Sequence, residues 1–114
     1  GFKDHRVLSN YGVILKGLGK LQDAEISTRK AIKLKPDYAE AHSNLGNILK
    51  NLGKLKEAEL STRKAIEIKP DYPDAHLNLA NILRNQGKLN ESELSNRRAN
   101  ELKCDYVNLI FFKD

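Results

Sequence analysis

A repeat of 34 residues runs through this chain of 114 residues and constrains its fold more than any other feature. The tripeptide Pro-Asp-Tyr at 36–38 recurs at 70–72 and, with Cys104 in place of the proline, at 104–106. Aligned without gaps, neighbouring blocks agree at about two-thirds of their positions. A fixed period over three copies is typical of a stacked array of small units. We therefore expect one domain over 1–114, with repeats at 5–38, 39–72 and 73–106.

Each block is predicted to form two helices joined by a tight turn. Apolar residues recur at helical spacing in 11–18 and 45–52, and a Gly-Lys-Leu sequence follows each segment. The second helix should end at the proline of the tripeptide, because proline lacks the N–H donor and clashes with the preceding turn. Asp37 is then expected to cap the next helix, with Glu40 completing a capping box.

Small residues stand where the two helices of a block should cross. Large side chains there would push the helix axes beyond the usual ~8–10 Å. Two such short helices cannot bury their own apolar stripe, so stacked neighbours must complete the core. The small residues are Gly12, Gly46 and Ala80 on the first helices, and Ala24, Ala58 and Ser92 on the second.

A 34-residue helix–turn–helix with small residues at these positions and a proline near its end resembles the tetratricopeptide repeat (TPR). The sequence departs from that family in the middle of the second helix, where Thr28, Thr62 and Asn96 replace an aromatic residue. The resemblance implies an all-α fold, an α-α superhelix that forms a right-handed TPR solenoid. It also implies a non-catalytic scaffold whose first helices line a concave surface, which holds an extended peptide or a partner's helix.

The family pattern places a polar row and a cationic row on that concave surface. An asparagine ladder of this kind resembles the ladder of those TPR arrays that hold peptide backbones with it. An asparagine side chain offers both a donor and an acceptor and so matches a peptide unit. The cationic row would favour acidic side chains on a ligand. The expected peptide-binding residues are Asn10, Asn44 and Asn78 in the ladder, Asn47 and Asn81 beside it, and Lys16, Lys50 and Arg84 in the cationic row.

The alternative interpretation is structural: the asparagines bond to neighbouring helix backbone, and the cations form a solvated surface. Among functions, we favour a scaffold for protein or peptide partners. A substrate-recruiting or regulatory fragment of a larger enzyme, such as a glycosyltransferase, remains the alternative. A nucleic-acid binder is less favoured, because Arg29, Arg63 and Arg97 each follow a glutamate by four residues and should pair with it.

Catalytic chemistry is not predicted. His42 and His76 lie one repeat apart, which is too far for one metal ion, and Cys104 has no cysteine or histidine nearby. We expect no enzyme activity, no cofactor and no metal. The net charge of the chain is +5. No apolar run approaches the ~18 residues of a membrane span, so we expect a cytoplasmic protein without membrane partners.

The last segment, 107–114, is strongly apolar and follows a third repeat whose second helix is more polar than the others. We expect it to form a short separate helix that packs on the third repeat, either as a cap or as the start of a fourth repeat. A homodimer through this segment is a further expectation, because an exposed apolar patch favours association.

Overall fold

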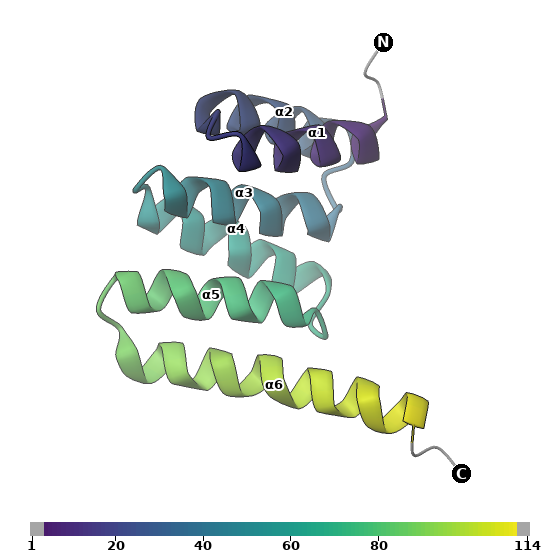
Figure 1. Ribbon diagram of the computed structural model, residues 1–114, viewed down its shortest axis with the longest axis vertical. Coiled ribbons are helices and arrows are strands. Elements are labelled where there is room, and N and C mark those ends of the chain that lie inside the picture. The colour runs from purple at the N-terminus through teal and green to yellow at the C-terminus, as the bar shows by residue number, and fades with distance from the viewer. Residues whose placement is uncertain (1–3, 112–114) are drawn as a thin grey trace.

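Six helices make up the computed structural model, which describes residues 4–111, with side chains for 4–105 and 110 (Figure 1). No strand occurs in this range. The helices follow one another as three hairpins, one for each repeat predicted from the sequence. They are α1 (His5–Gly17), α2 (Leu21–Leu34), α3 (Ala39–Asn51), α4 (Leu55–Ile68), α5 (Pro73–Asn85) and α6 (Leu89–Phe111).

A glycine with positive φ ends the first helix of each hairpin, as the Gly-Lys-Leu pattern predicts. Gly53 has a φ of 82°, and its N–H donates to the Lys50 carbonyl at 3.0 Å. The next N–H, of Lys54, donates to the Leu49 carbonyl at 2.9 Å. This pair of bonds is a Schellman motif, which satisfies the last carbonyls of the helix and reverses the chain.

The small residues predicted at the helix crossings are buried. An ideal Cβ on Gly46 would collide with the Thr62 hydroxyl and lie 3.2 Å from the Ala58 carbonyl. The backbone of α3 at Gly46 therefore lies directly against the Thr62 side chain of α4. Thr62 fits because its hydroxyl folds back on its own helix and donates to the Ala58 carbonyl at 2.8 Å.

The apolar core crosses the boundaries between repeats. Leu45, Leu49 and Ala58 of the second repeat form one cluster with Ile82 of the third. Ile32 of the first repeat packs against the same cluster. Stacking of neighbours thus completes the interior, as the shortness of the helices predicts.

The helices form two layers, and in only one of them do neighbouring helices of the same layer pack directly against each other. The first helices pack side by side, α1 against α3 and α3 against α5 (Figure 1). Within the described residues, α2 makes no close backbone contact with α4, nor does α4 with α6. The array therefore curves with α1, α3 and α5 on its inner side. We call the solvent-facing side of these three helices the inner face.

Two local predictions are wrong. The N-cap positions of α3 and α5 are Tyr38 and Tyr72, and neither Asp37 nor Asp71 caps a helix with its side chain. The Asp37 carboxylate instead lies 3.5 Å from the Lys35 ammonium. The tyrosine is favoured at the cap because its ring packs against the cluster of Leu8, Ala31 and Ala41.

The separate C-terminal helix is the second wrong prediction. Helix α6 continues without a break from Leu89 to Phe111, so residues 107–111 extend the third hairpin. Cys104 allows this because it keeps the backbone N–H that proline lacks. How the apolar segment packs depends on side chains beyond the described ones. Within the described range, no helix is long and apolar enough to cross a membrane.

Candidate functional site

The inner face carries the predicted site residues in one register on each helix. On α3 they lie at Asn44, Asn47 and Lys50, three residues apart, and helical geometry places such positions on one broad side. The same register on α5 holds Asn78, Asn81 and Arg84, and on α1 it holds Asn10, Val13 and Lys16.

The asparagine ladder connects neighbouring repeats. The Asn44 amide nitrogen donates to the Ser9 hydroxyl at 3.0 Å, and the Asn78 amide nitrogen donates to the Ser43 hydroxyl at 2.9 Å. Each asparagine is half-buried and each serine acceptor is buried. Asn44 and Asn78 therefore each use an amide hydrogen for a bond within the fold, and this bond holds their side chains in place.

The first rung differs from the other two. Asn10 is exposed, and no described residue forms a hydrogen bond with it. The serine partners were not among the predicted site residues. Their signal in the sequence is that a serine directly precedes Asn10 and Asn44, in the Ser-Asn dipeptides at 9–10 and 43–44.

The cationic row lacks carboxylate partners. Within the part of the chain that the structure describes, Lys16, Lys50 and Arg84 form no ion pair. Arg84 instead donates to the side-chain oxygen of Asn81 at 2.6 Å. Burial lowers the pKa of the Lys50 ammonium, and the neighbouring charges of Lys16 and Arg84 lower it further. The three cations thus lie close enough to repel one another.

The opposite edge of the inner face is acidic on α3 and α5, whereas the same position on α1 holds Arg6, which pairs with Asp4 at 3.3 Å. Glu40 and Asp74 lie in the first turns of α3 and α5, ten residues before Lys50 and Arg84 and so about 15 Å away along the helix. The Tyr38 hydroxyl donates to Glu40 at 2.9 Å. Burial, followed by this bond and the charge of Glu40, raises the pKa of Tyr38 to about 12. The tyrosine therefore stays a neutral donor and holds the carboxylate in place.

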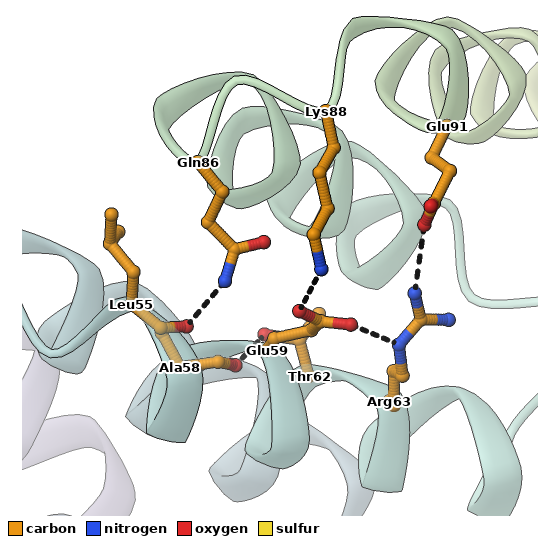
Figure 2. A network of polar contacts seen from close by, with 8 residues as sticks. All are labelled: Leu55, Ala58, Glu59, Thr62, Arg63, Gln86, Lys88 and Glu91. Carbon is orange, nitrogen blue, oxygen red and sulfur yellow. Dashed lines mark hydrogen bonds and ion pairs between the residues drawn. The ribbon is translucent and has the colours of Figure 1, made fainter.

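The arginines of the outer layer, in contrast, are paired with acids (Figure 2). The Glu59 carboxylate accepts from Arg63 at 2.8 Å and lies 3.5 Å from the Lys88 ammonium of the next repeat. Arg63 also reaches Glu91 at 3.6 Å. The hydrogen bond from Arg63 outweighs burial and holds the pKa of Glu59 below its ordinary value.

The same pairs recur between the first two repeats. Arg29 lies 2.9 Å from Glu25 and 3.4 Å from Glu57, while Lys54 lies 3.5 Å from Glu25. The pairing of Arg29, Arg63 and Arg97 with the glutamate four residues earlier is confirmed. These arginines are engaged within the fold and are therefore less available to a phosphate backbone.

The two repeated histidines have a structural role. The His42 ring nitrogen Nε2 lies 2.7 Å from the Pro36 carbonyl oxygen, and His76 Nε2 lies 2.8 Å from that of Pro70. A carbonyl accepts, so this nitrogen is the donor in each bond. No group of three or more potential metal ligands occurs among the described residues. Cys104 is exposed and forms no disulfide.

Comparisons with known families agree with this architecture. Models described as "Tetratricopeptide repeat" match residues 39–72 and 62–93, and a model described as "TPR repeat" matches residues 12–53. The chain is a tetratricopeptide repeat protein. Repeats of this family are protein-interaction scaffolds and are typically non-catalytic.

Solved structures share the fold. One titled "Crystal structure of MamA" superimposes with a TM-score of 0.84 at 21% identity, covering 95% of this chain and 63% of that one. Another, titled "MamA MSR-1 C2", gives a TM-score of 0.79 at 24% identity, covering 91% and 60%. This chain therefore spans less than two-thirds of either neighbour, and the likeness concerns the fold. A comparison with curated protein sequences gives no match.

Proposed function

We propose that the inner face binds an extended segment of a partner protein. The observation that carries this proposal is a row of three cations without carboxylate partners beside the asparagines of the same helices. The outer arginines are each paired with glutamate, whereas the three cations of the inner row have no carboxylate within the described residues. Unpaired cations beside fixed amide groups suit a ligand that brings both acidic side chains and a peptide backbone.

The asparagines supply the backbone contacts in this proposal. The Asn44 amide nitrogen is held by Ser9, and its side-chain oxygen has no hydrogen-bond donor among the described residues. Asn47 is half-buried and has no partner in the same range. An asparagine that is positioned but not satisfied can bond to a peptide N–H or C=O with little loss of side-chain entropy.

A test follows the side-chain amides by nuclear magnetic resonance during titration with unstructured peptides of acidic, neutral and basic composition. We expect the amide signals of Asn44, Asn47 and Asn78 to shift, and that of Asn90, exposed on the outer helix α6, to stay in place. Asn47→Ala should weaken binding without loss of stability, because Asn47 makes no bond within the fold. Peptide binding that shifts Asn90 and leaves the other three unmoved would contradict the proposal.

Recruitment of substrates for a larger enzyme would use the same face and is included in this proposal. The homodimer expected through residues 107–112 rests on side chains outside the described set, and it stays a prediction that sedimentation can check.

A further inference from the structure

The spacing of the inner helices sets the spacing of the cationic row. Lys16, Lys50 and Arg84 occupy the same position in successive repeats, near the ends of helices that pack directly against one another. Axes of packed helices lie ~8–10 Å apart. The positive charges therefore recur at about that interval along the array, one for each repeat.

Only one extended conformation of a peptide matches this interval with a whole number of residues. A polyproline II chain has three residues per turn and rises ~3.1 Å per residue, so equivalent side chains recur every ~9.3 Å on one side. A β-strand repeats on one side every two residues, or ~6.7 Å, which falls out of register with the row within two repeats.

We propose that the inner face selects a polyproline II segment of a partner protein that carries an acidic side chain at every third residue. This inference rests on the proposed function and names its ligand class. Three acids at positions i, i+3 and i+6 would each meet one cation of the row. The backbone between them would run beside the asparagines of the same three helices.

The acidic edge of the inner face explains why spacing, and not only total charge, should matter. Glu40 and Asp74 lie about 15 Å from the cations of their own helices. Acids that point toward that edge are repelled by these carboxylates. A uniformly acidic segment would place some of its charges there, whereas acids at every third residue of the helix all point to the cationic side.

The energetic basis is the absence of competing carboxylates. A surface cation that already has an acidic partner gains little from a second one, because the first carboxylate already offsets its charge. Lys16 and Arg84 lie in register with Lys50 on the neighbouring helices, and after burial their charges contribute to the lowered pKa of its ammonium. A ligand carboxylate relieves the repulsion between these charges as well as forming its own ion pair.

The experiment compares labelled peptides of about twelve residues with identical composition by fluorescence anisotropy. One carries three glutamates at every third position within a proline-rich sequence. A second carries them at every second position, and a third carries them in a cluster. We expect the first to bind at least ~10-fold more tightly than the others, and to lose that advantage at high salt.

Charge reversal identifies the surface. Lys50→Glu should weaken the first peptide by ~10-fold or more, and a peptide with lysine at the middle acidic position should bind this variant better than the wild type does. The matched control is Lys33→Glu, a reversal at an exposed lysine of the outer helix α2 that forms no ion pair with a described residue, which should change affinity less than ~2-fold.

The possible outcomes distinguish a failure of this inference from a failure of the proposed function. Equal affinity for the three acidic peptides overturns the spacing and leaves the proposed function standing. Absence of binding by every peptide overturns both. Tighter binding of single-stranded oligouridine than of any peptide would overturn the assignment of a protein segment as the ligand.

Discussion

At the residue scale, the two helices of each hairpin are matched to each other at one crossing point. Gly46 leaves no room for a Cβ, because Thr62 and the Ala58 carbonyl lie against it. In the first repeat, Gly12 meets Thr28 in the same way. Threonine, which stands here in place of the family's aromatic residue, packs directly against the glycine of the partner helix.

Gly46→Ala should lower the free energy of unfolding by ~1–3 kcal/mol, because overpacking outweighs the ~1 kcal/mol that alanine gains in helix propensity. Urea denaturation measures the change. The matched control is Gly17→Ala near the end of α1, where a Cβ would meet no atom within 4 Å. This control should lose no stability, and equal stability of the two variants would rule out the steric account.

At the element scale, the sequence predicts the helices well and their caps poorly. Hydrophobic period, the glycine turns and the prolines together locate five of the helices to within a few residues. Capping fails because Asp37 and Tyr38 compete for one position. Carboxylate capping is a local bond, whereas the tyrosine gains packing against Leu8 and Ala31, which are adjacent only in the folded chain.

The candidate site likewise has a part that the sequence predicts and a part that it does not. The rows of asparagines and cations follow from the repeat and a family pattern, because equivalent positions must share a face. The bonds from Asn44 to Ser9 and from Asn78 to Ser43 join different repeats, and their geometry depends on how far one repeat is rotated against the next. The repeat period in the sequence gives no information about that rotation.

Cys104→Pro should end α6 near Leu102, more than two turns before Phe111, because α2 and α4 end two residues before their prolines, and it restores the tripeptide of the other repeats. Proline removes the N–H at 104 and clashes with the carbonyl four residues before it. Hydrogen exchange of the amides at 105–110 should become faster, while the amides of α3 and α4 keep their protection. Cys104→Ala is the control and should leave exchange unchanged. Undiminished protection at 105–110 in the proline variant would contradict this reading of the helix end.

At the scale of the whole molecule, stacking decides what each repeated residue experiences. Ile14 is 59% exposed on α1, whereas Ile48, its equivalent on α3, is fully buried because Leu15 and Ala24 of the preceding repeat pack against it. Tyr11 and Leu45 differ in the same sense, at 44% and 3%. Identical positions in the period therefore carry different energies, which depend on the presence of a neighbour on each side.

Glu59, which joins the second repeat to the third, should make this stacking sensitive to acid. Its pKa is lowered in the folded protein, so its contribution is present above the ordinary glutamate pKa and is lost as the pH falls through the lower folded value. Denaturation measured from neutral pH down to about pH 3 should show stability declining below about pH 4.5. Glu59→Gln should reduce that decline, whereas Glu93→Gln, in an exposed pair, should not. Parallel pH profiles for Glu59→Gln and the wild type would exclude this role.

The two layers also resist deformation unequally. The inner helices are held by direct packing, whereas α2 and α4 are joined across the outer layer by long side chains such as Arg29 and Glu57, whose charges salt can screen. Flexing of the array therefore opens or closes the convex side and leaves the distance between inner helices nearly constant. We therefore expect a change in the curvature of the array to leave the spacing of the proposed binding residues nearly unchanged.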